Sequence, residues 1–177
     1  MAEDPNGVAL RRLRLDDLVR VREWRNLPEV ARYMYTDHEI GEGEHARWFG
    51  DALDRPDRRY WIIELEGRPV GLANLVDISE RHRRASWAFY LADEAVRGRG
   101  VGSFTERFVL KYAFEDLGLH KLCCEVLGSN DAVVAMHRKF GFVVDGVLRQ
   151  HIWKTDHFED VVTLSMTEDD YRARAER

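Results

Sequence analysis

One short segment, EAVRGRGVGSF at residues 94–104, constrains the fold more than any other part of the chain. It places glycines at the alternate positions Gly98, Gly100 and Gly102, and an apolar, strand-like run ends just before it at Leu91. Directly after it, apolar residues recur at helical spacing. A strand, a glycine turn and a helix in this order present backbone N–H groups and the positive end of a helix dipole to one point. The segment is therefore suited to hold an anion.

The patterns on both sides of this segment predict an α/β domain. The helix expected over residues 104–117 ends at Gly118, and another strand-like run follows. A strand–helix–strand crossover makes its two strands locally parallel. Strands are predicted at residues 8–12, 60–66, 70–77, 85–91, 122–127, 142–153 and 161–166, and the other helices at 16–25, 42–53 and 131–140.

Composition limits the classes of function. The formal net charge of −5 argues against general nucleic-acid binding, which shows as a basic excess over a whole domain. The two cysteines, Cys123 and Cys124, are adjacent in a predicted strand, so they point to opposite faces and do not bridge each other. No apolar run approaches the roughly 18 residues of a membrane span, and the N-terminus has no signal-peptide pattern. We expect one cytoplasmic domain over residues 1–177, with no nucleic-acid or membrane partner.

The glycine spacing separates the possible anion sites. A dinucleotide fingerprint needs G-x-G-x-x-G and a P-loop needs Gly-Lys followed by Ser or Thr, and neither pattern is present. Glycine lets a backbone approach a phosphate closely, and Arg97 and Arg99 add positive charge. Taken alone, the segment could also be only a flexible start to a helix.

Further motifs favour an anion site over a flexible start to a helix. The run at residues 97–102 resembles the Arg/Gln-x-x-Gly-x-Gly/Ala signature of the GNAT superfamily of acyl-CoA N-acyltransferases, and it lies between a strand and a helix as in that family. HKLCCEV, then Asn130, then MHRKFGF ending in Gly141 and Phe142, resemble the next strand, asparagine and helix. The resemblance covers nearly all of residues 8–171. It implies a mixed, mostly antiparallel central sheet with a parallel, splayed strand pair and flanking helices.

By this resemblance the co-substrate is acetyl-CoA. Its pyrophosphate would lie on the backbone amides of the glycine segment, and its pantetheine arm would pair with the open edge of the preceding strand like an added strand. The residues that the resemblance assigns to acetyl-CoA are Phe89, Tyr90, Leu91, Arg97, Gly98, Arg99, Gly100, Val101, Gly102, Ser103, Asn130, His137 and Lys139.

Acetyl transfer to an amine needs a neutral amine, donors for the developing oxyanion and a proton source for the CoA thiolate. The family usually supplies that proton from a tyrosine seven residues after the asparagine, and this chain has His137 there. An imidazole can serve as a general acid, although a surface histidine is the simpler interpretation. Many members also carry a glutamate where this chain has Ser86. His45, Glu64, Asp77 or water remain candidates for the base.

The segment at residues 21–40 carries the information about the acceptor. Its WRN, PEV and YMY motifs resemble two branches, one that acetylates ribosomal-protein N-termini and one that acetylates the UDP-linked 4-amino sugar of pseudaminic acid synthesis. The tail GVLRQHIWKTDHFEDVVTLSM favours the second branch, and we expect a UDP-4-amino-4,6-dideoxy-N-acetyl-altrosamine type of acceptor. YMY could instead be a loop that packs on the core. The substrate-binding candidates are Arg25, Asn26, Tyr35, His45 and Trp48.

Three weaker patterns remain. The basic turn at residues 81–84 could touch the 3′-phosphate of CoA, but a solvated turn is the better interpretation. Two histidines and two acids at residues 151–159 match no standard ligand spacing, and we expect no metal. The segment at residues 167–170 resembles a helix N-cap.

Two functions other than sugar acetylation stay open at this stage: an N-terminal acetyltransferase of ribosomal or other proteins, and a non-catalytic CoA-binding module. The second is suggested by the absence of the usual tyrosine and glutamate. The sequence leaves the oligomeric state open, with a homodimer as the candidate.

Overall fold

A computed structural model describes residues 7–96 and 98–175 of the chain. Its seven-stranded sheet has the order β1-β2-β3-β4-β5-β7-β6, and of the pairs in this sheet only β4 with β5 is parallel. The strands are β1 (Val8–Arg12), β2 (Arg59–Leu65), β3 (Arg68–Ser79), β4 (Arg84–Leu91), β5 (Lys121–Leu127), β6 (Val143–Lys154) and β7 (His157–Thr167). The α-helices are α1 (Leu18–Asn26), α2 (Pro28–Ala31), α3 (Glu42–Asp54), α4 (Val101–Lys111), α5 (Asp131–Lys139) and α6 (Glu168–Ala175). The mixed α/β fold expected from the sequence is confirmed.

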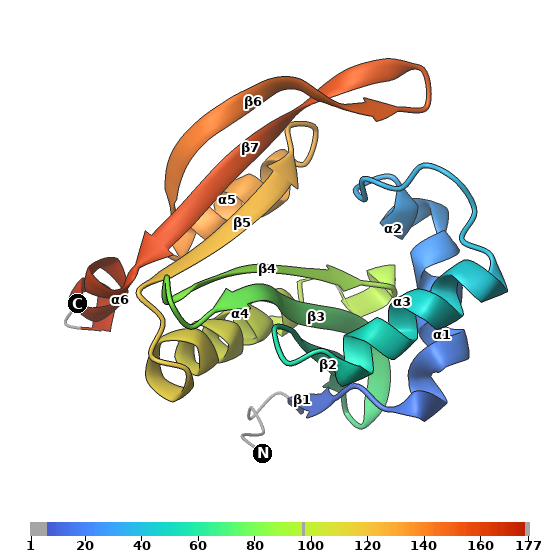
Figure 1. The fold of residues 1–177 in the computed structure, drawn as a ribbon, viewed down its shortest axis with the longest axis horizontal. Helices are drawn as coiled ribbons and strands as arrows, with labels where there is room; N and C mark the ends of the chain where they lie inside the picture. The colour runs from blue at the N-terminus through green and yellow to red at the C-terminus, as the bar shows by residue number, and fades with distance from the viewer. Residues whose placement is uncertain (1–6, 97, 176–177) are drawn as a thin grey trace.

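Strand β2 shows why the middle of the sheet is apolar on both faces. Trp61 and Ile63 point into a large cluster with side chains from α4, whereas Tyr60 and Ile62 point into a smaller cluster with side chains from α1 and α3. Successive strand residues face opposite sides, so a strand covered by helices on both sides needs an unbroken apolar run. Helices α4 and α5 therefore cover one face and α1 and α3 the other (Figure 1).

The parallel strand pair is short, and this feature positions the site. Residues 84–86 of β4 pair with residues 121–123 of β5, but β4 continues to Leu91 and β5 to Leu127. Beyond Ser86 the two strands diverge, so the sheet opens into a V with β1–β4 on one arm and β5–β7 on the other (Figure 1). The splayed parallel pair expected from the GNAT resemblance is thus present. Backbone groups on this edge of β4 are left without a strand partner there.

Most predicted elements have the expected positions, with three differences. Helix α4 starts at Val101 and gives way to a π-helical turn at Tyr112–Asp116, so the predicted helix at residues 104–117 is two kinds of helix. The short helix α2 was not predicted. The turn between β6 and β7 is shorter than predicted, because the positive φ of 56° at Thr155 closes the hairpin there.

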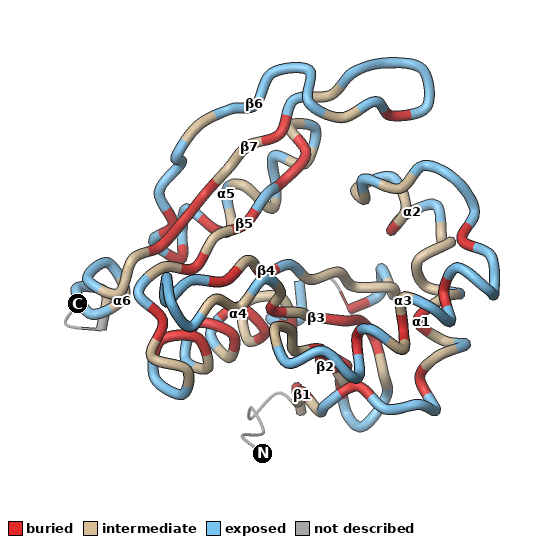
Figure 2. The backbone as a smooth tube through the Cα atoms, in the orientation of Figure 1, coloured by how far each residue is buried: buried red, intermediate tan, exposed pale blue. Residues whose placement is uncertain are grey.

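The C-terminal cap was predicted correctly. The Thr167 hydroxyl accepts from the Asp170 N–H at 3.2 Å, and the Asp170 carboxylate accepts from the Thr167 N–H at 2.9 Å. This reciprocal pair begins α6. Figure 2 shows that β5 and β7 carry many buried residues, whereas β6 is mostly exposed. No helix in the described part of the chain is long and apolar enough to cross a membrane.

Candidate active site

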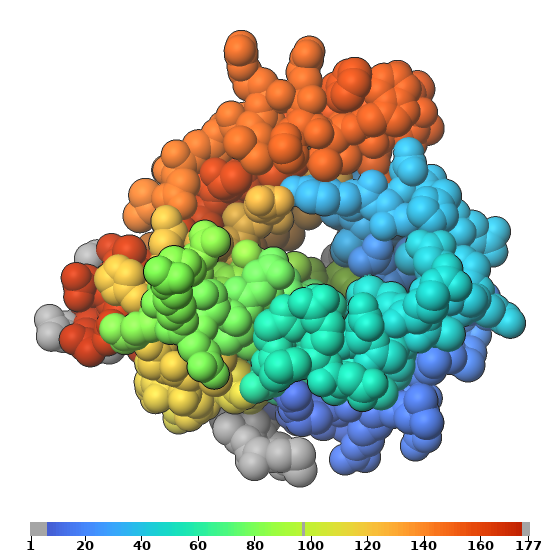
Figure 3. Space-filling view, in the orientation of Figure 1, coloured from blue at the N-terminus to red at the C-terminus, as the bar shows by residue number. Residues whose placement is uncertain are grey.

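The divergence of β4 and β5 leads to an opening through the molecule. Figure 3 shows it between the segment that follows α2, strand β5 and the β3–β4 arm. The part of β4 beyond Ser86 lies on the side where β5 has turned away. An open strand edge can pair with an extended ligand in the way that an added strand does. The opening is where the sequence expects the pantetheine arm of acetyl-CoA, along residues 89–91.

The glycine segment lies at the far end of β4 and has the geometry of an anion cradle. Gly98 and Gly100 have φ angles of +78° and +79°, in the left-handed region that side chains rarely adopt. Gly100 is the N-cap of α4, and no side chain caps this helix start. The first-turn N–H groups of an uncapped helix are free to bind an anion. Val101 is buried and Ser103 half-buried on that first turn.

The structure describes only one of the two arginines of this segment. Arg97 lies outside the described residues. The guanidinium of Arg99 contacts the Glu66 carboxylate in the β2–β3 turn at 2.5 Å, and both side chains are exposed. An exposed ion pair contributes little stability, so Arg99 can exchange this partner for a phosphate.

Gly102 and Gly71 allow close packing around β4. A Cβ on Gly102 would lie 3.6 Å from the Phe89 ring and 3.5 Å from the Met136 sulfur, so α4, α5 and β4 meet there. A Cβ on Gly71 would lie 2.3 Å from the carbonyl oxygen of Tyr90. Only glycine fits at that point of β3, and the close approach fixes the path of the β4 segment expected to bind pantetheine.

His137 is buried rather than on the surface. Its Nδ1 atom lies 2.8 Å from Oε1 of Glu106 on α4, and both side chains are almost completely buried. Its ring packs edge-on against Trp87 at 5.1 Å between ring centroids. Trp87 is the first residue of β4 beyond the last pair with β5. The surface interpretation of His137 is therefore wrong, and the imidazole lies at the apex of the V.

Three other predicted residues make no contact with the described part of the chain that would assign them a role. Ser86 is half-buried in the last β4–β5 pair, opposite Cys123. Asn130 is the N-cap of α5, and its side chain makes no cap hydrogen bond. Lys139 is exposed at the end of the same helix. Their assigned roles stay predictions.

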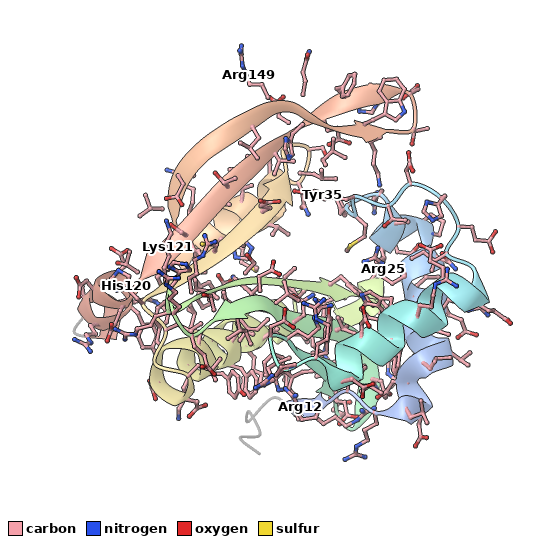
Figure 4. The ribbon with its side chains drawn as sticks, viewed as in Figure 1. Arg12, Arg25, Tyr35, His120, Lys121 and Arg149 are labelled. Carbon is pink, nitrogen blue, oxygen red and sulfur yellow. The ribbon has the colours of Figure 1, made fainter. Side chains whose placement is uncertain are left out.

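The acceptor side of the opening contains a half-buried cation, Arg25. The Arg25 guanidinium on α1 donates from Nη2 to the Thr36 hydroxyl at 3.4 Å, while its buried Nε atom has no partner. Burial lowers the pKa of Arg25, and its charge interacts with the Tyr90 and Tyr60 hydroxyls. The buried Tyr90 hydroxyl also lacks a partner, and burial raises its pKa. Figure 4 places Arg25 beside the opening.

Three predicted substrate residues hold the neighbouring helices together. Both ends of the Asn26 amide hydrogen bond to the backbone of Ile40, at 2.8 and 3.1 Å. The Nε2 atom of His45 lies 2.8 Å from the Leu18 carbonyl oxygen, and its ring stacks on Trp48. Burial lowers the pKa of His45, which favours its neutral form. These contacts stabilise the packing of the helices. That the same residues also contact a substrate stays a prediction.

The segment after α2 is tied across the opening to the other arm. The Tyr35 hydroxyl donates to Glu125 on β5 at 2.7 Å, and burial together with this carboxylate raises the pKa of the phenol. The Lys154 ammonium donates to the carbonyl oxygens of Ala31, Met34 and Thr36. The YMY segment therefore forms one wall of the opening (Figure 4).

The structure corrects or adds to other assignments. Glu64 was a candidate base, but its carboxylate lies on β2 and accepts from Arg11 at 2.7 Å, away from the opening. Sequence reasoning did not find Glu106, Glu125 or Lys154, because their partners lie far away in the chain. Within residues 7–96 and 98–175, no group of three or more His, Cys, Asp or Glu side chains could hold a metal ion.

Comparison with known proteins identifies the family. Residues 8–143 match the family described as the acetyltransferase (GNAT) domain. This chain belongs to the GNAT family. It is an acetyl-CoA-dependent N-acetyltransferase, so the alternative of a non-catalytic CoA-binding module falls away.

Several relatives of this GNAT enzyme are spermidine N-acetyltransferases. The one from Escherichia coli K12 is 26% identical over 95% of this chain and 90% of the relative. The structure of the Vibrio cholerae enzyme with CoA and spermine matches with a TM-score of 0.87 at 22% identity, over 94% of this chain and 98% of that one. A further Vibrio cholerae structure, with a TM-score of 0.82, is dodecameric. At this identity the structures show a shared fold.

Another relative matches over a shorter part of this chain. The acetyltransferase PseH of Campylobacter jejuni is 24% identical over 69% of this chain and 74% of the relative. The expected membership of the nucleotide-sugar branch is therefore not confirmed at the level of sequence similarity.

Proposed function

We propose that this GNAT enzyme transfers acetyl from acetyl-CoA to the primary amine of a nucleotide-linked amino sugar, of the UDP-4-amino-4,6-dideoxy-N-acetyl-altrosamine type. The observation that carries the proposal is the Arg25 guanidinium, a half-buried cation whose buried Nε atom has no partner and which forms no ion pair among the described residues, although the charge of Glu44 acts on it. A buried charge is costly unless an opposite charge or hydrogen bonds compensate it. A sugar diphosphate supplies such a partner, and guanidinium groups bind phosphates by two hydrogen bonds.

A second cation favours an anionic acceptor. Burial lowers the pKa of Lys154, the carboxylates of Asp37 and Glu159 raise it, and the positive charge of Arg25 lowers it, so Lys154 and Arg25 influence each other. A polyamine would bring further positive charge close to these two cations. A diphosphate would reduce the repulsion between them.

On the acetyl-CoA side, the proposal places the pyrophosphate on the α4 N-terminus and the pantetheine along the open edge of β4. The acceptor amine then attacks the thioester carbon, and His137 supplies the proton for the departing CoA thiolate. The uncapped first turn of α4 and the burial of His137 at the apex of the V support these positions.

A polyamine is the second candidate acceptor. The spermidine N-acetyltransferases of Escherichia coli and Vibrio cholerae align with more than nine-tenths of this chain. The exposed carboxylate of Glu125 beside the opening could accept a cationic amine. An N-terminal peptide, expected from the ribosomal branch, has no such contact to favour it.

One experiment separates these acceptors. The protein is incubated with acetyl-CoA and, in separate reactions, a UDP-4-amino sugar, spermidine or an N-terminal peptide, and the products are identified by mass spectrometry. We expect the acetylated sugar nucleotide with the highest kcat/KM. Faster acetylation of spermidine would replace the proposal with the polyamine function, and faster acetylation of the peptide would replace it with the ribosomal one.

Arg25 gives the matching prediction. Arg25→Ala should raise the KM for the sugar nucleotide by about 10- to 100-fold, because a hydrogen bond to a charged group contributes roughly 1.5–3 kcal/mol. The KM for acetyl-CoA should stay within about twofold, as expected for a contact made only with the acceptor. Steady-state kinetics with each substrate varied in turn measures both values.

Arg22→Ala is the matched control, because Arg22 lies on the same helix and pairs with the exposed Glu42 at 3.1 Å. It should leave both KM values unchanged. An equal loss for both substrates in Arg25→Ala would assign Arg25 to the packing of α1 and would remove the main support for an anionic acceptor.

A further inference from the structure

The pair formed by Glu106 and His137 connects two helices at the centre of the molecule. Glu106 lies on α4 and is 0% exposed, and His137 on α5 is 3% exposed. One carboxylate oxygen lies 2.8 Å from Nδ1, whereas the other, Oε2, is buried without a partner. A fully buried carboxylate with a single partner is costly to the fold. A catalytic role would explain why such a costly pair is present in the core.

The pair fixes which ring nitrogen faces the reaction. A carboxylate can only accept hydrogen bonds, so the imidazole proton lies on Nδ1, and Nε2 keeps its lone pair. Nε2 has no hydrogen-bond partner among the described residues. An imidazole in this state accepts a proton at Nε2 and can then return it.

Aromatic rings pack around the His137 imidazole. The His137 ring lies against Trp87, where β4 loses its partner β5, and against Phe142 at 5.3 Å between ring centroids. The Cys124 thiol on β5 is a titratable group near the pair, and burial raises its pKa, as does the charge of Glu106. The indole N–H of Trp87 is also buried and unpartnered, so among the described residues it is a donor left without an acceptor at the apex.

We infer that Glu106 and His137 form a proton shuttle, in which His137 is the catalytic residue and Glu106 the positioning residue. The inference rests on the proposed acetyl transfer to an amine. The amine nitrogen bonds to the thioester carbon, and its surplus proton moves to Nε2. The C–S bond then breaks with its electron pair on sulfur, and Nε2 gives the same proton to the thiolate. The imidazole returns to its starting state, and Glu106 holds Nδ1–H throughout.

The shuttle explains how the reaction proceeds without two groups that the resembling enzymes carry. The usual tyrosine acid is replaced by His137, and the glutamate position holds Ser86, which cannot act as a base unaided. A single imidazole with a fixed tautomer performs both transfers, so neither group is required.

Glu106→Gln tests the positioning role at nearly constant shape. An amide can donate to Nδ1 and move the ring proton to Nε2, which removes the acceptor. We expect kcat to fall by about 10²- to 10⁴-fold, the typical contribution of general acid–base catalysis, with the KM for acetyl-CoA within about threefold. Glu115→Gln is the control, since Glu115 accepts from Tyr171 at the end of the same helical region, and it should keep full kcat.

A double-mutant cycle separates catalysis from packing. His137→Phe should lower kcat by a similar factor, and Glu106→Gln added to it should lower kcat no further, because the carboxylate acts only through the imidazole. Independent, multiplying losses would show that Glu106 supports the fold rather than the shuttle. Thermal unfolding and acetyl-CoA binding by calorimetry establish that each variant is folded. A Glu106→Gln enzyme with unchanged kcat would overturn the inference.

Nitrogen-15 NMR of His137 tests the inference without any acceptor. We expect the wild-type ring to carry its proton on Nδ1 at neutral pH, and the Glu106→Gln ring to carry it on Nε2. An Nε2-protonated wild-type ring would mean that Glu106 is the neutral donor, and it would exclude the shuttle. Failure of the sugar nucleotide as acceptor would overturn the proposed function but would leave this result intact.

Discussion

Lys154 illustrates how single residues complete the opening. Its ammonium donates to the backbone carbonyl oxygens of Ala31, at the end of α2, and of Met34 and Thr36 in the segment that follows, which lie 118 to 123 positions away in the sequence. Met34 and Thr36 belong to no helix or strand, so the lysine replaces hydrogen bonds that such an element would supply. Burial lowers the pKa of Lys154, so the contact has a desolvation cost.

We predict that Lys154→Met loosens this segment. Methionine has a similar length but no donor, so the carbonyl oxygens of Ala31, Met34 and Thr36 lose the lysine, and a buried group left unsatisfied costs about 1–3 kcal/mol. The melting temperature should fall, and the KM for the acceptor should rise more than that for acetyl-CoA. Differential scanning fluorimetry and steady-state kinetics measure these effects. Lys111→Met, at an exposed position at the end of α4, is the control, and an identical response of the two variants would contradict the prediction.

The role of a residue could be predicted only where the signal lies in nearby residues of the sequence. His137 was singled out by its position seven residues after Asn130, where the resembling GNAT enzymes carry a tyrosine, and its catalytic role stays a prediction. Its partner Glu106 lies 31 positions away on another helix, so only the packing of α4 against α5 reveals it. His45 looked like a candidate base, but the contact between α1 and α3 places it against the Leu18 carbonyl.

The glycine segment is the element that the sequence predicts best, since positive φ angles select glycine. Gly100→Val should raise the KM for acetyl-CoA by about tenfold or more, because a non-glycine residue in the left-handed region costs roughly 1–3 kcal/mol and would distort the α4 N-terminus. Kinetics with acetyl-CoA as the varied substrate measures this.

Gly118→Val is the matched control. Gly118 has a φ of +60° and open space around its Cβ position, but it lies at the other end of the helical region. It should cost similar stability and leave the KM for acetyl-CoA unchanged. Equal KM values in the two variants would show that the glycine segment does not hold the pyrophosphate.

Strands were easier to predict than short or irregular elements. The apolar run of β2 is unambiguous, because residues on both of its faces are buried, and β5 shows strand periodicity, because Leu122, Cys124 and Val126 are buried on one face. Helix α2 has four residues, too few to show a periodic pattern, and Pro28 at its start indicates only a turn. The π-helical turn at Tyr112–Asp116 leaves no signature in apolar spacing, because it shifts the phase by less than one residue per turn.

At the scale of the whole molecule, β6 is an unprotected edge. This twelve-residue strand ends the sheet, and large apolar side chains on the hairpin are about half exposed. They include Val143, Val147, Trp153 and Phe158. A long apolar edge strand in water invites pairing with another chain. We propose that a second copy of this chain covers it.

Sedimentation velocity should therefore show a dimer or a larger oligomer. Val147→Glu should shift the population toward the monomer, because a charge would be buried in the contact. Val19→Glu is the control, since Val19 is equally exposed, at 54%, but lies on α1. A monomeric wild-type protein would refute the proposal.

The contacts of Lys154 and Tyr35 join the two arms of the sheet, so the opening in Figure 3 is bordered by protein on all sides. A closed aperture selects by cross-section, which an open groove does not. A slender molecule can thread its amine to the apex whatever its total length. An amine on a bulky acceptor reaches the apex only as far as the groups around it can enter the rim.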